Sequence, residues 1–368
     1  MPRTIVYVSC AAAGEVVSFR LDNDTGVLTP VGQAAVAGTV LPPPISMPMA
    51  LTPDHRYLYA ACRNPPFPVT CFAIGEDGAL TSIGIGHLAD TLAYLSTDRT
   101  GRYLFGASYF GASLSVNPIG ADGVPGDPLQ VLSTPPKAHS IQPDPENRAV
   151  YAAVLGGDVI LRQEFSALTG RLSTPATPAA HTAPGAGPRH FRFARAGAFL
   201  YCVNELNGTL NAYARDSATG SLTELQSVRL VQFTLTANGR DPATGTLPER
   251  QSVRLVPADA PGATFSSADL HLTPDERFLY ASERVNNVLA GFRLHPDGTL
   301  EAIGTVPADP EPRGFAIDPR GRWLLCAGQW TGDVAVYRID ASSGALTRLA
   351  AYPAGGNANW IEIVDLPA

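Results

Sequence analysis

The chain has 368 residues, of which 45% are hydrophobic and 16% are charged, and its formal net charge is -7. Lys137 is the only lysine, so no basic stripe can follow a phosphate backbone, and we expect no nucleic-acid partner. No segment approaches the roughly 20 apolar residues of a transmembrane helix, and the N-terminus lacks a signal-peptide pattern. We therefore expect a soluble, cytoplasmic protein with no membrane partner.

One unit, a turn followed by an apolar strand, recurs along the chain. Its copies are LTPDHRYLYAAC (51–62), STDRTGRYLFGAS (96–108), PDPENRAVYAAV (143–154), FARAGAFLYCVN (193–204), LTPDERFLYASE (272–283) and IDPRGRWLLCAG (317–328), and TIVYVSC (4–10) is a seventh copy of the strand. Most spacings between equivalent residues lie between 45 and 52 residues, the length of one propeller blade. The repeat predicts an all-β protein, a seven-bladed β-propeller with four antiparallel strands per blade.

A second pattern, two alternating strands joined by a glycine turn, follows the first. Examples are VVSFRLDNDTGVLTPVG (16–32), GFRLHPDGTLEAIG (291–304) and VAVYRIDASSGALTRLA (334–350). Such glycines supply the positive φ of tight hairpins, so these pairs are expected to be the two outer strands of each blade. The chain ends with NWIEIVD (359–365), which has the pattern of an innermost strand. This strand should complete the N-terminal blade and close the ring, which makes residues 1–368 a single domain.

One spacing breaks the repeat, because Tyr201 and Tyr280 are 79 residues apart. The segment DSATGSLTELQSVRLV (216–231) recurs as DPATGTLPERQSVRLV (241–256), a close copy offset by 25 residues. No further turn-and-strand unit accompanies the copy. Residues 232–256 are therefore predicted to be an inserted, duplicated hairpin or loop at the outer edge of the fifth blade.

Polar residues recur at two repeat-equivalent positions, the start of the innermost strand and the end of the next strand. The first position holds His139, Arg189 and Arg313, with Asp269 close to it in another blade, and the second holds Arg63, Glu205, Arg284 and Gln329. The two strands are antiparallel neighbours, so both sets should meet at one mouth of the central channel. Arginine offers forked donors to carboxylate and phosphate, which favours a small anionic ligand. Solvated channel residues, or Arg–Glu pairs that tie blades together, are the alternative interpretation.

Other motifs give weaker signals. His190 follows Arg189 directly, so strand alternation predicts that its side chain faces the opposite side of the strand. The remaining histidines form no cluster with metal-ligand spacing, and no GxSxG elbow is present. We expect no metal and no cofactor. The five cysteines have no CxxC spacing and are expected to be buried, reduced thiols.

Three segments carry a family resemblance: PGAGPRHFRFARAGAFLYCVNELNGTL (184–210), SADLHLTPDERFLYASER (267–284) and EPRGFAIDPRGRWLLCAGQ (311–329). They resemble the propeller-type 6-phosphogluconolactonases, whose superfamily includes the fungal carboxy-muconate lactonising enzymes, and the likeness covers almost the whole chain. The resemblance implies hydrolysis of an acidic sugar lactone at the channel mouth. In the muconate branch a His, two Arg and a Glu form the proposed functional set, which matches His139, Arg189, Glu205 and Arg313 here.

The expected roles follow from lactone chemistry. His139 or Glu205 would activate water without a metal, and Arg189 would polarise the lactone carbonyl. Neighbouring arginines should lower the pKa of Glu205, which favours His139 as the base. The expected substrate-binding residues are Arg313, Arg284, Gln329, Arg63, His190 and Asp269. Alternatives are a muconate-type cyclase, a hydrolase of another acidic lactone, or a non-enzymatic binding platform; we expect a monomer or a weak homo-oligomer.

Overall fold

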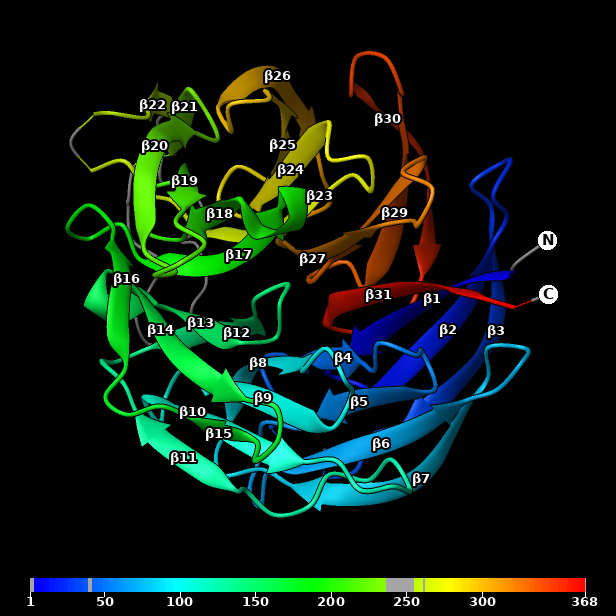
Figure 1. Cartoon of the computed structure of the whole chain (residues 1–368). Coiled ribbons are helices and arrows are strands. Elements are labelled where there is room, and N and C mark those ends of the chain that lie inside the picture. The colour runs from blue at the N-terminus through cyan, green and yellow to red at the C-terminus, as the bar shows by residue number, and fades with distance from the viewer. Residues whose placement is uncertain (1–2, 39–41, 236–254, 261, 368) are drawn as a thin grey trace.

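Seven antiparallel sheets surround a central axis in the computed structural model, which describes residues 3–367 except 39–41, 236–254 and 261 (Figure 1). The innermost strands are β31 (Ala358–Leu366), β4 (Met49–Leu51), β8 (Leu92–Thr97), β12 (Ala138–Pro143), β17 (Pro188–Ala194), β23 (Ser267–Leu272) and β27 (Pro312–Ile317). The second strands are β1 (Arg3–Cys10), β5 (Tyr57–Ala61), β9 (Tyr103–Ser108), β13 (Ala149–Val154), β18 (Phe199–Asn204), β24 (Phe278–Glu283) and β28 (Trp323–Gly328). The predicted seven-bladed propeller is confirmed.

The outer half of each blade is a hairpin. The third strands are β2 (Glu15–Leu21), β6 (Pro68–Ile74), β10 (Ser113–Pro118), β14 (Val159–Ser166), β19 (Thr209–Arg215), β25 (Val288–Leu294) and β29 (Asp333–Ile339). The outermost strands are β3 (Leu28–Ala35), β7 (Leu80–His87), β11 (Gln130–Ser133), β16 (Thr177–His181), β20 (Leu222–Arg229), β26 (Leu300–Pro307) and β30 (Leu346–Pro353). In the fourth blade the short strand β15 (Arg171–Leu172) also pairs with β14.

The ring closes through the two ends of the chain. The C-terminal β31 pairs antiparallel with the N-terminal β1, with Tyr7 opposite Glu362 and Thr4 opposite Asp365. This sheet has the order β3-β2-β1-β31, so the last strand is the innermost strand of the first blade. The two termini consequently lie side by side (Figure 1). Closure removes two exposed strand edges that an open array would leave.

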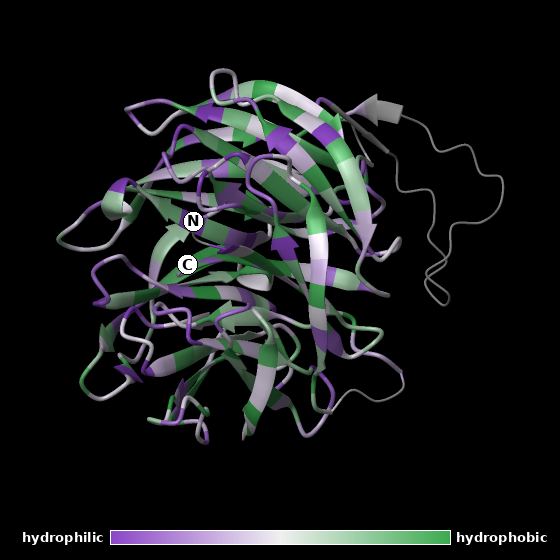
Figure 2. Ribbon diagram, turned by 90° about the vertical axis from the view of Figure 1, so that its right-hand side faces the viewer, coloured by the Kyte–Doolittle hydropathy of each residue, from purple (hydrophilic) through white to green (hydrophobic). Residues whose placement is uncertain are grey.

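The hydrophobic core lies between neighbouring blades. Second strands such as β9, β13 and β28 are buried along their whole length, because each blade face packs against the next blade. Outermost strands such as β26 are mostly exposed, and a β-bulge in β26 interrupts the alternation of its faces, so that less exposed residues recur at every third position. Hydrophobic stretches accordingly run along the strands, while many of the connecting loops are hydrophilic (Figure 2). The five cysteines are all free and buried, as expected from the sequence.

A tyrosine on the second strand links five blades to their neighbours. Each tyrosine hydroxyl donates to the carbonyl of the hairpin glycine in the next blade, in the pairs Tyr7–Gly78, Tyr59–Gly123, Tyr151–Gly220, Tyr201–Gly298 and Tyr280–Gly344. These glycines have φ between 73° and 87°, which a side chain would strain. The other two blades carry Phe105 and Leu325 at the tyrosine position, which have no hydroxyl to donate.

Replacing Tyr280 with phenylalanine should lower the free energy of unfolding by about 1–3 kcal/mol, because the Gly344 carbonyl loses its buried donor. The hydroxyl lies 2.7 Å from that carbonyl and the tyrosine is fully buried. Urea unfolding measures the change. Tyr352→Phe on the outer strand β30 is the matched control and should cost less than 0.5 kcal/mol; equal losses in both variants would contradict the proposed link.

The inserted segment follows the fifth blade. Strands β21 (Phe233–Leu235) and β22 (Leu255–Pro257) pair with each other in a separate two-stranded sheet beside β20 (Figure 1). Most of the predicted repeat copy, residues 241–254, lies outside the described residues, so the duplicated hairpin stays a prediction. Among the described residues, no helix is long and apolar enough to cross a membrane.

Candidate active site

An irregularity in the innermost strands positions the first set of predicted site residues. The pairing register shifts between Ala138 and Ser140 in β12 and between Pro188 and His190 in β17. The residue that each shift skips, His139 or Arg189, is one of the predicted site residues, and a similar shift surrounds Arg313 in β27. A bulge leaves the extra residue unpaired and re-aims its side chain. Three blades therefore direct a basic side chain toward the same mouth of the channel.

The second set begins where the second strands end. Glu205 directly follows β18, and Arg284 directly follows β24. The Glu205 carboxylate accepts hydrogen bonds from Arg189 Nε at 2.9 Å and from Arg284 Nη2 at 3.0 Å. Arg284 also approaches Glu311 Oε1 to 3.5 Å. The two predicted rings thus meet, and the Glu205 carboxylate joins the fifth and sixth blades.

The arginines keep Glu205 ionised. Burial by itself would raise the pKa of Glu205, but Arg189, Arg284 and Arg313 together lower it below the ordinary value. Burial lowers the pKa of Arg189 to about 10, so this side chain remains charged at neutral pH although it is only 2% exposed. A carboxylate bound to two guanidinium groups is a weak base.

His139 lies beside this ion pair in its neutral form. Burial and the charges of Arg189, His190 and Arg313 hold the pKa of His139 well below 6.5. Its Nε2 lies 4.0 Å from Glu205 Oε2, too far for a hydrogen bond. No hydrogen bond to the Glu205 acceptor therefore fixes the ring proton on Nε2, so Nε2 can be the unprotonated nitrogen that accepts a proton.

The cluster carries more positive than negative charge. Among the described residues, Glu205 and Glu311 are the carboxylates at ion-pair distance from Arg189 and Arg284, while Asp269 and Asp90 act on Arg189 and Arg63 from farther away. Within the described part of the chain, the hydrogen bond of the Arg313 guanidinium is a long one of 3.5 Å to Gln329 Oε1. Burial and the three other arginines lower the pKa of Arg313 well below its ordinary value. An anion would relieve this repulsion.

Arg63 reaches the mouth from the second blade. Its Nη1 donates to Ser46 Oγ at 2.8 Å and its Nε to Thr91 Oγ1 at 3.1 Å, so its described partners are neutral hydroxyls. Its Nη2 is buried without a hydrogen-bond partner among the described residues. A buried guanidinium nitrogen without a partner is a ready donor for an anionic ligand.

An open groove of about 650 Å³ lies next to Arg313. Its lining residues are Pro43, Pro44, Ile45, Glu311, Arg313, Gln329, Trp330 and Asn357. Gln329 donates to Asn357 Oδ1 at 2.6 Å and to the Ile45 carbonyl at 3.0 Å, which fixes its amide at the groove wall. The groove supplies space for a sugar-sized molecule beside the charged cluster.

His190 and Asp269 lie behind Arg189 and not at the groove. His190 Nδ1 is 2.8 Å from Asp269 Oδ1, and His190 Nε2 is 3.2 Å from Arg189 Nη1. Because Arg189 can only donate, His190 Nε2 accepts and its proton sits on Nδ1 toward Asp269. The expectation that His190 faces the opposite side of the strand from Arg189 is wrong, because the bulge at Arg189 interrupts the alternation.

Two charged residues of the channel were not singled out from the sequence. Glu311 pairs with Arg284 from the loop that precedes β27, and Arg192 lies deeper in the channel on β17. Arg192 lies two residues after His190 on the same strand. Strand alternation counted from His190 therefore predicts that Arg192 faces the same side, and this signal could have identified it. Glu311 lies in a loop, where no periodicity identifies a facing side chain.

Comparisons with known proteins agree with the seven-bladed fold. The family model described as "Lactonase, 7-bladed beta-propeller" matches residues 4–363. The 6-phosphogluconolactonase of Pectobacterium carotovorum is 36% identical over 98% of this chain and 99% of its own length, and that of Serratia proteamaculans is also 36% identical with the same coverage. The solved structure of the periplasmic gluconolactonase of Pseudomonas aeruginosa covers 100% of this chain and 99% of its own, with a TM-score of 0.82 and 26% identity.

Proposed function

Because the chain belongs to the lactonase family of seven-bladed β-propellers, we propose that it hydrolyses 6-phosphogluconolactone to 6-phosphogluconate at the mouth formed by His139, Arg189 and Glu205. The observation that carries this proposal is a neutral histidine beside a surplus of arginine charge at one channel mouth. Two relatives named 6-phosphogluconolactonase, each 36% identical to the chain, support the choice of substrate. A cytoplasmic location belongs to the same proposal, and the five free thiols are consistent with it.

In the proposed reaction a water molecule attacks the lactone carbonyl carbon while His139 accepts the water proton. Arg189 Nη2 makes no hydrogen bond within the described residues, so this nitrogen is the donor available to the developing oxyanion. The carbon–oxygen bond of the ring then breaks, and the ring oxygen leaves as a hydroxyl with the proton from His139. The carboxyl product ionises, and the released proton passes to solvent.

Glu205 holds the polarising arginine in place. It binds Arg189 and Arg284 at 2.9 and 3.0 Å, which fixes both guanidinium groups before the substrate enters. Arg284 is balanced by Glu205 and Glu311. Arg313 and Arg63 have no carboxylate partner among the described residues, so we assign the substrate phosphate to them.

The proposal is tested by the initial rates of purified protein with three substrates: 6-phosphogluconolactone, unphosphorylated gluconolactone and a muconolactone. The rates above spontaneous hydrolysis should fall in that order, because only the first carries a phosphate for Arg313 and Arg63. Hydrolysis of the muconolactone alone would refute the assignment, and no acceleration with any of the three would refute lactonase activity.

Arg313→Gln should raise the KM for 6-phosphogluconolactone about 10- to 100-fold, the loss of one charge-assisted hydrogen bond. The KM for gluconolactone should change much less, because that substrate has no phosphate. Arg293→Gln, an arginine on the outer strand β25, is the control and should leave both values unchanged. Equal increases for both substrates would show that Arg313 does not contact the phosphate.

The kcat/KM for gluconolactone should stay constant from pH 8 down to pH 6 and decrease only at lower pH. The base must be neutral, and burial together with Arg189, His190 and Arg313 disfavours the protonated form of His139, so its pKa lies well below 6.5. Gluconolactone is chosen because the second ionisation of a phosphate near pH 6 would obscure the enzyme's own titration. A decrease that begins above pH 6.5 would contradict a buried, neutral His139.

A further inference from the structure

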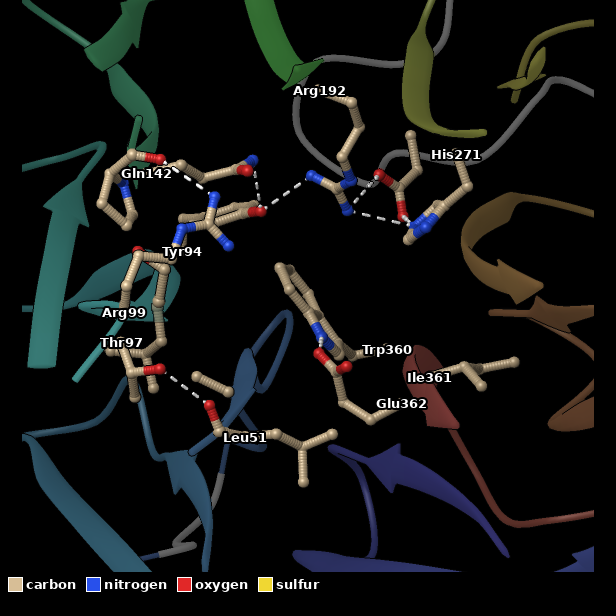
Figure 3. Close-up of a pocket in the computed structure, with 15 residues that line it drawn as sticks. Leu51, Tyr94, Thr97, Arg99, Gln142, Arg192, His271, Trp360, Ile361 and Glu362 are labelled. Atoms are coloured by element: carbon tan, nitrogen blue, oxygen red, sulfur yellow. Dashed lines mark hydrogen bonds and ion pairs between the residues drawn. The ribbon is translucent and has the colours of Figure 1, made fainter. Parts of the chain in front are cut away.

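A second chamber lies on the channel axis on the other side of the site. Three residues after each member of the ring that contains His139, Arg189 and Arg313, the innermost strands place Ala50, Ser96, Gln142, Arg192, His271, Ala316 and Glu362. All of these except Ala316 line a cavity of about 310 Å³, together with Leu51, Thr97 and Arg99 near its opening. Figure 3 shows Arg192 and His271 on one side of this axial chamber and Trp360 and Glu362 on the other.

A layer of aromatic side chains separates the axial chamber from the active-site mouth. The rings of Tyr94 and His190 lie 5.0 Å apart between centroids, and those of Tyr94 and Trp360 lie 5.2 Å apart. His139 makes an edge-to-face contact with His190 on the active-site side of this layer, with 5.2 Å between the ring centroids. Of the described residues, none lines both the axial chamber and the groove beside Arg313. The two spaces are therefore distinct sites.

The axial chamber presents positive charge to a ligand. Arg192 Nη1 donates to the Tyr94 hydroxyl at 2.9 Å, and Arg192 Nη2 lies 3.1 Å from His271 Nε2. Asp269, the nearest carboxylate among the described residues, accepts from His190 Nδ1 at 2.8 Å and lies 3.9 Å from Arg192. His271 Nε2 lies 3.2 Å from Asp269 but cannot donate to it while it accepts from Arg192. Arg192 is thus hydrogen-bonded to neutral groups, and the carboxyl groups of Asp269 and Glu362 act on its charge from a distance.

Hydrogen-bonding groups without net positive charge face Arg192 across the axial chamber. Among the described residues, the hydrogen bond to the Glu362 carboxyl comes from Trp360 Nε1 at 2.8 Å. Burial raises the pKa of Glu362 to about 7, so near neutral pH this group can both donate and accept. Gln142 donates to the Tyr94 hydroxyl at 2.8 Å, beside Arg192, and also lines the chamber. The amide of Gln142 and the carboxyl of Glu362 suit the hydroxyl groups of a ligand.

We propose that the axial chamber is a second ligand site, which binds a small polyhydroxy carboxylate with its carboxylate at Arg192 and its hydroxyls at Glu362 and Gln142. Arg99 at the opening adds a second positive charge for the same carboxylate. Trp360 offers an apolar ring face to the carbon chain of the ligand. The site stands independently of lactone hydrolysis, because it shares no catalytic residue with the active-site mouth.

D-gluconate titrated calorimetrically at pH 6.5 tests this site. The starting protein is Arg313→Gln, which weakens anion binding at the active-site mouth so that the remaining binding reports the axial chamber. One site is expected, with at least tenfold weaker binding after the further change Arg192→Gln. Acetate, which lacks the hydroxyls, should bind at least tenfold more weakly than gluconate. No gluconate binding to the starting protein, or equal binding after Arg192→Gln, would overturn the proposal.

Arg99→Gln provides a second variant in case Arg192→Gln does not fold. Arg99 is exposed, and within the described residues its guanidinium group donates only to the carbonyls of Pro143 and Asp144, so replacement of this side chain should leave the fold intact. Gluconate binding should weaken three- to tenfold in this variant. Circular dichroism and thermal unfolding establish that each variant is folded, and unchanged affinity in a folded Arg99→Gln protein would count against the proposal.

Gluconate affinity should also decrease between pH 6 and pH 8, because ionisation of Glu362 adds negative charge to the axial chamber. The charged or titratable groups that face Glu362 are Arg192, Asp269 and Tyr94, and His271 and Arg99 line the same space. Burial lowers the pKa of His271 and that of Asp269 lies well below 3.8, whereas the pKa of Glu362, about 7, lies inside this range. Glu362→Gln should remove the pH dependence, and its persistence would exclude Glu362 from the site.

Discussion

Replacing His139 with alanine is expected to lower kcat for 6-phosphogluconolactone by about 10² to 10⁴, the usual contribution of a general base. The imidazole is 5% exposed and neutral, and it lies next to the guanidinium group that would stabilise the oxyanion. Without it, water must attack without a proton acceptor. Initial rates over a range of substrate concentrations separate this loss from a change in KM.

His181→Ala is the matched control for the His139 variant, because His181 is exposed on the outer strand β16. Its kcat should equal that of the wild type. Glu205→Gln, measured in the same assay, decides between the two candidate bases. If His139→Ala retains kcat within about threefold while Glu205→Gln loses activity in a folded protein, Glu205 is the base and the proposed assignment is wrong.

Glu205→Gln should also lower the free energy of unfolding, by about 3–5 kcal/mol. The amide removes the charge that compensates Arg189, which is 2% exposed and bound at 2.9 Å. Two further arginines, Arg284 and Arg313, then repel Arg189 without an intervening carboxylate. Urea unfolding at pH 7 measures the loss.

The control for this stability effect is Glu164→Gln, which removes a carboxylate that is 72% exposed and lies 3.3 Å from Arg162. Such exposed pairs contribute about 0–1 kcal/mol. The folded-state pKa of Glu205 is depressed, so its stabilisation is present above the ordinary value of 4.5 and is lost as pH falls through the lower folded pKa. The difference between wild type and Glu205→Gln should therefore shrink in acid; a constant difference would contradict the ionised carboxylate.

The propeller could be predicted from the sequence because its repeat is local. Each blade carries the same turn and second strand, and the tyrosine that marks this strand, as in Tyr151 and Tyr201, is also the residue that bonds to the next blade. The tyrosine of the second strand thus belongs both to the sequence repeat and to the packing between blades. Ring closure was predictable for a similar reason, since β31 alone supplies the missing innermost strand.

The positions of the site residues could be predicted only where the strands keep their regular alternation. His139, Arg189, Glu205, Arg284 and Arg313 meet as expected, because equivalent positions of a propeller form rings. The bulges in the innermost strands β12, β17 and β27 were not predictable from alternation. The bulge in β17 turns His190 toward Asp269 behind the arginines.

The axial chamber could not be predicted from the sequence, because the residues that line it share no chemical type. Ala50, Gln142, Arg192 and Glu362 occupy equivalent positions, yet no repeated polar pattern marks them. Only the packed structure shows that a cavity remains between these residues and the aromatic layer of Tyr94, His190 and Trp360. A mixed set of this kind is detected by cavity geometry and not by composition.

The most direct test is the ratio of kcat/KM for 6-phosphogluconolactone between the wild type and the double variant His139→Ala/Arg313→Gln, with the fold of both verified by circular dichroism. The active-site assignment predicts a wild-type rate well above spontaneous hydrolysis and a loss of at least about 10³ in the double variant, from one general base and one phosphate contact. Equal values for the two proteins would show that lactone hydrolysis does not take place at this mouth of the propeller.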